Sequence, residues 1–357
     1  MLDLTRLLPG GYCTLLLADH GADVVKVEDT GAGDYARADP PSFAALNRGK
    51  RSIQLDLKSA GGREAFLRLA VEADVVVESF RPGVMDRLGV GYETLRGVNE
   101  RLVYCAITGY GQDGPLRDRA GHDLNYLARA GVLALSGDAG APPAQAAVQI
   151  ADVAGGALMA AFGIMAALRT GEGQFVDISM TDGALSLLAM PAGQLLAGGP
   201  VPRRGDLVLG GRLLCYRPYA CADGWVSVGA LEPKFWAAFC RGVGREDLVA
   251  HQYDPPGSEA HAEVAAIIAA RTRAEWEAFN AEHDCCVEPL LELDEALADA
   301  GDMVAGEGLA TPVRLSATPA SFAGAAPGLG EHTDAVLAAA GYGPDEIAAL
   351  RAAGAAK

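Results

Sequence analysis

Short β-branched runs alternate with helical stretches over the first hundred residues, and this alternation most constrains the fold. Three such runs lie at residues 24–27, 52–55 and 75–77. Residues 12–20 precede the first run. Residues 61–72, with apolar side chains at helical spacing, separate the second run from the third. Strands that alternate with helices form parallel sheets, so we predict an open α/β fold with a mostly parallel sheet.

The same pattern continues beyond residue 100. Residues 102–107 predict a further strand, and residues 122–135 and 152–169 predict two helices. His122 then lies near the N-terminus of the first helix and Asp152 near the N-terminus of the second. Helix N-termini present unpaired N–H groups and partial positive charge, which would stabilise a nearby enolate oxygen.

A change in composition near residue 195 predicts a second domain. Residues 195–204 combine Gly, Pro and Arg, as a linker does. Residues 216–230 predict two strands joined by a tight turn, residues 232–283 predict amphipathic helices, and residues 287–290 predict a short strand. A chain of 357 residues would ordinarily hold two domains.

The dipeptide His122-Asp123 and the later Asp152 are the strongest candidates for catalysis. A His and an Asp that converge on one carbon can remove a proton from one face and return it to the other. This is the minimum equipment for inverting a carbon next to a carbonyl. Asp152 also has a simpler interpretation as a helix cap. Asp123 would face away from His122 at a helix start, so we interpret it as a supporting residue.

The composition narrows the class of protein. Hydrophobic residues make up 50% of the chain, which favours folded domains over disorder. The formal net charge of −17, without a basic block, argues against nucleic-acid binding. Seven scattered cysteines lack a C-x-x-C pair, so we expect reduced, mostly buried thiols in a cytoplasmic protein, with no metal site. The start predicts no signal peptide, and the apolar residues 153–168 predict a packed helix and no membrane span.

The order of several segments resembles the class III coenzyme A transferase family over nearly the whole chain. The segments are LLLADHGADVVKVE (15–28), LNRGKRSIQLDLK (46–58), ADVVVESFRPGVMDRL (73–88), GYGQDGP (109–115), the His122 motif, Asp152, GEGQFVD (171–177) and EHTDAVL (331–337). Within the family, Gly-His-Asp at 121–123 resembles the α-methylacyl-CoA racemase branch. Transferase relatives usually carry another residue at the position of His122, and their carboxylate at the position of Asp152 is the nucleophile.

This resemblance implies a larger α/β domain at 1–195 and 310–357, a smaller α+β domain at 205–309, and an interlocked homodimer. It implies racemisation of acyl-CoA thioesters in fatty acid or sterol side-chain metabolism. Coenzyme A enters only as part of the substrate, without a prosthetic group. A CoA transferase that forms an anhydride on Asp152 is the first alternative. A non-catalytic acyl-CoA-binding protein is the second, although binding alone would require neither His122 nor Asp152.

Cations near the strand ends are candidates for holding coenzyme A. No G-x-G-x-x-G follows the first strand, so a Rossmann dinucleotide site is not expected. Coenzyme A carries a 3′-phosphate and a diphosphate, which a few cations and backbone N–H groups can bind. The candidate cofactor-binding residues are Arg37, Arg48, Arg51, Leu57, Lys58, Arg81, Arg87, Gly121 and Tyr126.

Three further expectations follow from the resemblance. Racemases of the family place a carboxylate at the position of Glu232, where it hydrogen-bonds the catalytic His; a helix-terminus role is its simpler interpretation. Many relatives carry an Arg that contacts the nucleotide just after the acidic residue ending their first strand. Here Glu28 is followed by Asp29, and either Arg37 substitutes or one contact is missing. Relatives also have several residues before the position of Met1 that complete the first strand.

Overall fold

The computed structural model describes residues 1–306, 308–322 and 324–357 and divides the chain into two compact units. Unit 1 consists of Met1–Ala130, Ala146–Leu187 and Gly301–Lys357, and unit 2 consists of Gly131–Gln145 and Leu188–Ala300. The sequence-based boundaries had placed residues 131–145 in the larger domain. The structure puts this segment with unit 2, where a salt bridge of 3.9 Å joins Asp138 to Arg217.

A six-stranded sheet in the order β3-β2-β1-β4-β5-β6 forms the centre of unit 1, and each of its pairings is parallel. The strands are β1 (Leu2–Asp3), β2 (Val25–Glu28), β3 (Arg51–Gln54), β4 (Val75–Glu78), β5 (Val103–Thr108) and β6 (Phe175–Ser179). The predicted α/β fold with a parallel sheet is confirmed. The strand order reverses between β1 and β4, and ligands of open α/β sheets bind at the carboxyl ends of strands at such a point.

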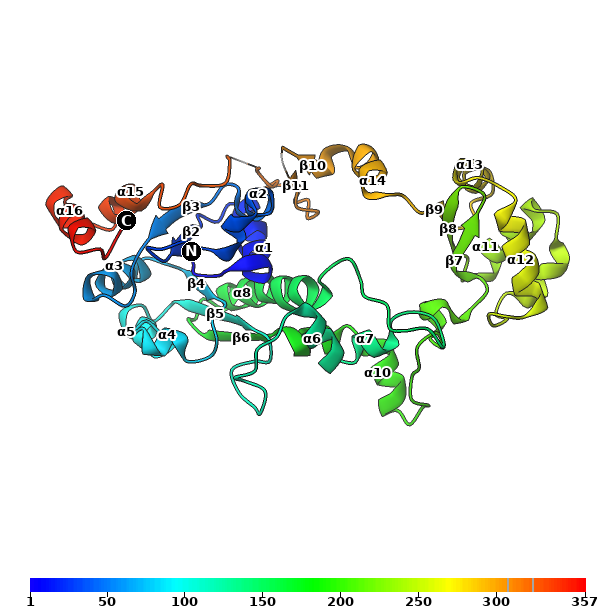
Figure 1. Ribbon diagram of the computed structural model, residues 1–357, viewed down its shortest axis with the longest axis horizontal. Helices are drawn as coiled ribbons and strands as arrows, with labels where there is room; N and C mark the ends of the chain where they lie inside the picture. Colours follow the sequence, from blue (N-terminus) through cyan, green and yellow to red (C-terminus); the bar gives the residue numbers. More distant parts are fainter. Residues whose placement is uncertain (307, 323) are drawn as a thin grey trace. The chain divides into compact units, whose positions relative to one another are not determined.

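Helices cover both faces of this sheet (Figure 1). The helices on one face are α1 (Leu7–Asp19) and α8 (Met159–Thr170). The helices on the other face are α3 (Ala60–Val71), α4 (Val84–Arg87), α5 (Tyr92–Val98), α15 (Thr333–Ala339) and α16 (Pro344–Ala352). The remaining elements of unit 1 are η1 (Tyr35–Ala38), α2 (Pro40–Asn47), α6 (Asp123–Arg129), η2 (Ala151–Leu158), α9 (Met180–Ser186), η5 (Gly301–Met303), β10 (Val304–Ala305) and β11 (Gly308–Leu309).

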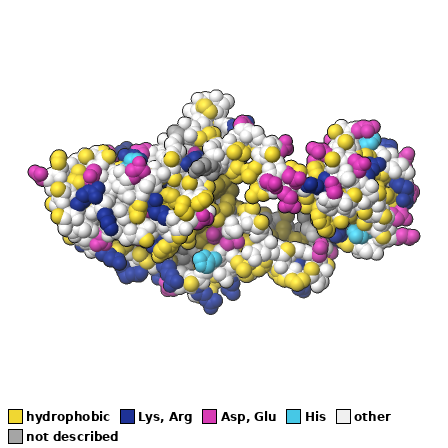
Figure 2. Space-filling view, turned by 45° about the horizontal axis from the view of Figure 1, so that its top comes forward, with side chains coloured by type: hydrophobic (Ala, Val, Ile, Leu, Met, Phe, Trp, Pro, Cys, Tyr) yellow, Lys and Arg dark blue, Asp and Glu magenta, His cyan; other side chains and the backbone are white. Residues whose placement is uncertain are grey.

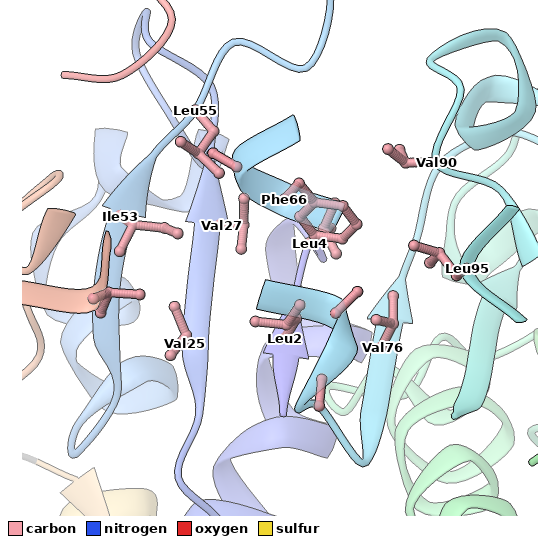
Figure 3. Packing of buried hydrophobic residues seen from close by; sticks show 14 of the residues in the cluster. Leu2, Leu4, Val25, Val27, Ile53, Leu55, Phe66, Val76, Val90 and Leu95 are labelled. Atoms are coloured by element: carbon pink, nitrogen blue, oxygen red, sulfur yellow. The ribbon is translucent and has the colours of Figure 1, made fainter. Parts of the chain in front are cut away.

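The main hydrophobic core lies between the sheet and α3, α4 and α5. Figure 3 shows Phe66 of α3 beside Leu4, with Leu2, Val27 and Val76 on the neighbouring strands. Full burial of a side chain of this size stabilises a fold by about 1.5–3 kcal/mol. The β-branched runs that predicted the strands therefore also supply the surface that holds the helices in place.

Unit 2 has a core of its own, built on an antiparallel sheet in the order β7-β8-β9. Its elements are α7 (Val132–Leu135), α10 (Ala189–Leu196), η3 (Val208–Arg212), β7 (Tyr216–Cys221), β8 (Gly224–Gly229), α11 (Pro233–Gly242), η4 (Glu246–His251), α12 (Glu259–Ala269), α13 (Arg273–His283), β9 (Val287–Pro289) and α14 (Leu293–Asp299). Trp236, Phe239 and Trp276 stack at its centre. The predicted hairpin and the helices after it are confirmed.

The predicted helix at 122–135 is interrupted, whereas the one at 152–169 is continuous. Gly131 has φ +82°, a left-handed conformation that ends α6 and separates it from α7. The π-helical turns of η2 run directly into α8, so residues Ala151–Thr170 form one helix, long and apolar enough to cross a membrane. It packs on α1, β5 and β6 but leaves Phe162 73% exposed. Hydrophobic side chains also lie exposed among charged ones on the face shown in Figure 2.

Two glycines set how closely η2 approaches α9. A Cβ on Gly183 would lie 2.1 Å from the carbonyl oxygen of Gly155, and one on Gly155 would lie 2.8 Å from the backbone oxygen of Met180. Real Cβ atoms do not approach other atoms so closely, so only glycine permits this contact. Asp152 lies one turn before Gly155 on the same helix, and the contact therefore also sets the position of Asp152.

We expect Gly183→Ala to lower the free energy of unfolding by about 1–3 kcal/mol, because α9 must move away from η2. Urea denaturation followed by circular dichroism measures the change. Gly97→Ala is the matched control, since a Cβ built on this helical glycine would meet no described atom within 4 Å apart from its chain neighbours and the backbone of its own helix. The control should be neutral or stabilise by up to about 1 kcal/mol. Equal stability of Gly183→Ala and the parent would show that the helix contact tolerates a methyl group.

Candidate active site

Two cavities open at the carboxyl ends of the strands in unit 1. The first, of about 570 Å³, is lined by residues that follow or end β1, β2 and β3, among them Leu4, Glu28 and Leu55. The second, of about 1160 Å³, is lined by His122 and Asp152. Arg6 and Phe80 line both cavities, so the two adjoin at the point where the strand order reverses. This is the site predicted for a ligand of an open α/β sheet.

His122 is the residue that begins helix α6. Its backbone is extended, with φ −131° and ψ 175°, and its N–H donates to the Asn125 side-chain oxygen at 3.0 Å. The Asn125 N–H in turn donates to the His122 carbonyl at 2.8 Å. These two hydrogen bonds occupy backbone groups at the start of the helix. The imidazole of His122 is exposed and lines the second cavity. This confirms the predicted place of His122 at a helix N-terminus.

Asp123 caps the helix that carries Asp152. One oxygen of its carboxylate accepts hydrogen bonds from the backbone N–H groups of Ala151, at 2.7 Å, and of Asp152, at 3.1 Å. These N–H groups belong to the first turn of η2, which would otherwise lack partners. Asp123 thus joins the start of α6 to the start of η2. Its placement agrees with a supporting role, and it takes the capping role that was the alternative interpretation of Asp152.

The pKa of the Asp152 carboxyl departs from the ordinary value of an aspartate. Burial raises the pKa of its carboxyl to about 6, and the negative charge of Asp123 adds to that rise, whereas His122 opposes it. A carboxyl with such a pKa holds a proton part of the time near neutral pH. Both of its forms are then available, as a group that acts alternately as acid and base requires.

Tyr126 holds the segment before His122 in place. Its ring is packed against Gly109 and Gly121, where a Cβ would lie only 2.4 Å and 2.7 Å from ring atoms. The ring also meets Tyr110 edge to face, with centroids 5.2 Å apart, and its hydroxyl donates to the Gly121 carbonyl. Burial raises the pKa of the Tyr126 hydroxyl to about 12, so it stays a donor. Tyr126 and Gly121 both line the second cavity, as a ligand-contacting role requires.

Of the other residues predicted to bind coenzyme A, three line a cavity. Leu57 and Lys58 line the first cavity, where they follow β3, and Arg81 lines the second. Arg87 lies nearby on α4, with Nη1 3.4 Å from the position of a Cβ on Gly83.

Three predicted arginines are committed to other partners. Arg37 makes two hydrogen bonds to Glu28, of 2.7 Å and 2.6 Å, and lines neither cavity. Arg48 pairs with Asp19, and Arg51 pairs with Asp23, both at 2.6 Å. Arg48 and Arg51 lie at the amino end of β3, whereas the first cavity lies at its carboxyl end, and neither arginine lines either cavity. Contact of these three residues with a ligand in the cavities is not supported by their positions.

The structure adds cations that the sequence analysis did not consider. Arg117 and Arg119 line the second cavity, and Arg6 lines both. Because Arg117 and Arg119 lie within five residues of His122 in the sequence, their place on the wall of its cavity could have been predicted. Glu232 precedes Pro233 at the start of α11 in unit 2, as its helix-terminus interpretation expects. Its pairing with His122 stays a prediction.

Comparison with known proteins identifies the family. Residues 1–333 match the CoA-transferase family III. The chain belongs to this family. It is 38% identical to the alpha-methylacyl-CoA racemase of Mus musculus, over 98% of this chain and 94% of the relative. It is 36% identical to the succinyl-CoA:mesaconate CoA-transferase of Haloarcula marismortui, over 96% of this chain and 95% of the relative.

A solved structure supports the same family. The CAIB/BAIF family protein from Brucella suis superposes with a TM-score of 0.82 at 30% identity, covering 95% of this chain and 97% of that one. The predicted family and fold are therefore confirmed. Racemases and transferases resemble the chain to a similar degree, so identity alone does not distinguish the two reactions.

The hydrogen bonds between Asp123 and η2 lead to a prediction about the pKa of Asp152. Asp123→Asn keeps an oxygen that accepts the two backbone hydrogen bonds but removes a negative charge. Because that charge helps to raise the pKa of Asp152, we expect this pKa to fall below about 6. Carbon-13 NMR titration of labelled aspartate carboxyls, with Asp152→Asn for assignment, measures the change.

Asp182→Asn is the control, since Asp182 is exposed and is not among the charges that act on Asp152. An unchanged or higher pKa of Asp152 in Asp123→Asn would contradict the electrostatic part of this account.

Proposed function

We propose that the protein inverts the α-carbon of 2-methylacyl-CoA thioesters by proton transfer. The observation that supports this most is the pairing of His122 with Asp152 in one cavity, where Asp152 has a pKa of about 6. Both side chains come from the starts of helices, and Asp123 connects these two starts. An imidazole and a carboxyl that can each act as acid or base suit a reaction that runs in both directions.

The reaction follows from the chemistry of the thioester. Sulfur donates poorly into the carbonyl, so the α-proton of a thioester is more acidic than that of a free acid. His122 or Asp152 takes this proton, the C–H electron pair moves into the carbonyl, and an enolate forms. The opposite residue then donates a proton to the other face of the α-carbon. Helix N-termini near the enolate oxygen stabilise its negative charge.

The two cavities suit the two ends of an acyl-CoA. The first, with Lys58 on its wall, would hold the nucleotide, and the second would hold the thioester. Leu8, Leu46 and Ile107 give the second cavity an apolar wall against which an acyl chain can pack. At about 1160 Å³ it exceeds the usual range of roughly 300–1,000 Å³ for ligand pockets. A bulky branched acyl chain would therefore fit.

Two expectations from the family resemblance complete the proposal. Glu232 would accept a hydrogen bond from His122 and fix its tautomer, as carboxylates do for catalytic imidazoles. The active molecule would be a cytoplasmic homodimer. The exposed apolar side chains of Leu158, at the end of η2, and of Phe162 and Met165 in α8 are compatible with burial in such a dimer.

A CoA transferase is the competing function, favoured by relatives of that name at 36% identity. In that reaction the carboxylate of Asp152 attacks the thioester carbonyl and forms an anhydride. A carboxyl with a pKa of about 6 is mostly ionised near neutral pH, so the acidity of Asp152 does not distinguish a nucleophile from a base. His122 has no part in the attack on the carbonyl, whereas proton transfer uses it. The presence of His122 in the same cavity therefore favours proton transfer.

The proposal predicts that His122→Ala and Asp152→Ala each lower racemisation of a 2-methylacyl-CoA by roughly a hundred- to ten-thousand-fold. Chiral chromatography of the hydrolysed acid, without any added acceptor acid, measures the rate. Binding of coenzyme A should remain, because neither side chain is expected to hold the phosphates. Asp182→Ala, which removes an exposed carboxylate of α9, is the control and should retain the parent rate.

Near-parent racemisation by either variant would remove that residue from the mechanism. Two results together would show that the protein is a CoA transferase. Coenzyme A would be transferred to an added carboxylic acid, and hydroxylamine would trap an acyl or CoA adduct on Asp152.

A further inference from the structure

Arg6 occupies the junction of the two cavities, and its guanidinium is held there by four contacts. It donates to Asp29 at 2.8 Å and to the Tyr35 hydroxyl at 3.0 Å. Its central carbon lies 4.9 Å from the centre of the Tyr35 ring and 5.3 Å from that of Phe80. These aromatic rings attract the cation and orient it. Arg6 thus faces any ligand that extends from one cavity to the other.

The backbone around Arg6 is fixed by a buried ion pair. Lys26 donates to the Thr5 carbonyl at 2.9 Å and pairs with Asp34 at 2.8 Å. The other Asp34 oxygen accepts the Leu7 N–H at 2.9 Å. The residues on both sides of Arg6 are therefore anchored to the same pair, whose side chains are buried. Arg6 is held in position before a ligand arrives, so ligand binding need not order this loop.

The guanidinium retains capacity for an anion. It carries five N–H donors, and the hydrogen bonds to Asp29 and Tyr35 use two of them. The Arg6 side chain is 27% exposed and that of Asp29 is 46% exposed, so ligand atoms can reach the remaining donors. The planar guanidinium matches the geometry of phosphate oxygens better than an ammonium does.

Position 29 gives an independent reason for a cation at this place. An Asp follows Glu28 here, where relatives were expected to carry a nucleotide-contacting Arg. Arg37, the substitute suggested by the sequence, is committed to Glu28 and lines neither cavity. Arg6 lies in salt-bridge contact with Asp29 itself. The positive charge at this point of the site therefore comes from a different strand end.

We propose that Arg6 binds the diphosphate of coenzyme A and that Asp29 orients its guanidinium for this contact, an inference that rests on the proposed function. The diphosphate is the part of coenzyme A that joins the nucleotide to the pantetheine arm. Arg6 lies in the corresponding place, between the cavity suited to the nucleotide and the cavity of His122. Charge-assisted contacts of this kind change affinity by roughly ten- to a hundred-fold.

Calorimetric titration of the full chain with three ligands tests this inference. Arg6→Ala should weaken coenzyme A and 3′-dephospho-coenzyme A alike, by roughly ten- to a hundred-fold, because both contain the diphosphate. It should leave binding of a pantetheine thioester within about twofold of the parent, because that ligand lacks phosphate. Adding Asp29→Arg to Arg6→Ala returns a cation to the site and should recover roughly tenfold of the lost affinity.

Arg351→Ala is the matched control, because it breaks a salt bridge of the same 2.8 Å length, to Asp334, on the surface of unit 1. It should bind all three ligands like the parent. Any one of four results would overturn the inference. Arg6→Ala could bind coenzyme A as the parent does, lose affinity equally for all three ligands, or lose affinity only for the ligand with a 3′-phosphate. The fourth such result is that adding Asp29→Arg recovers no affinity. Failure of the parent protein itself to bind coenzyme A would instead refute the proposed function.

Discussion

The carboxylate of Asp123 accepts hydrogen bonds from the N–H groups of Ala151 and Asp152, and the geometry of the candidate site depends on this contact. Helices α6 and η2 are far apart in sequence, and one charge-assisted cap brings their starts together. The cap places His122, immediately before Asp123, beside the cavity that Asp152 also lines. It also leaves the Asp152 side chain free of a capping role. A negative charge at this point then helps to raise the pKa of Asp152 to about 6.

The sheet supplies the rest of the site through its topology. Reversal of strand order between β1 and β4 leaves a crevice at the carboxyl ends, and both cavities open there. Close contacts at glycines set the positions of η2, which carries Asp152, and of the segment before His122. Gly155 and Gly183 let η2 approach α9, and Gly109 lets the Tyr126 ring pack beneath the His122 segment. Each of these contacts brings a glycine backbone close to a neighbouring element, so the candidate catalytic side chains are carried by closely packed helices.

Most of the strands and the two catalytic candidates could be predicted because their signals are local. Runs with β-branched residues mark β2, β4 and β5, and the residues that begin a helix follow from the pattern after them. The role of Arg6 could not be predicted, because its neighbours Asp29, Tyr35 and Phe80 meet it only through the strand order. The partner of Arg37 could not be predicted for the same reason, since nothing local shows that Glu28 occupies its guanidinium.

The central claim is that His122 and Asp152 serve opposite faces of one α-carbon, and isotope exchange on resolved enantiomers tests it most directly. In deuterated water, Asp152→Ala should exchange the α-proton of only one enantiomer of a 2-methylacyl-CoA, and His122→Ala should exchange only that of the other. Each variant retains one of the two bases, so neither should invert the centre at a substantial rate. Exchange of the same enantiomer by both variants, or of both enantiomers by either one, would contradict the claim.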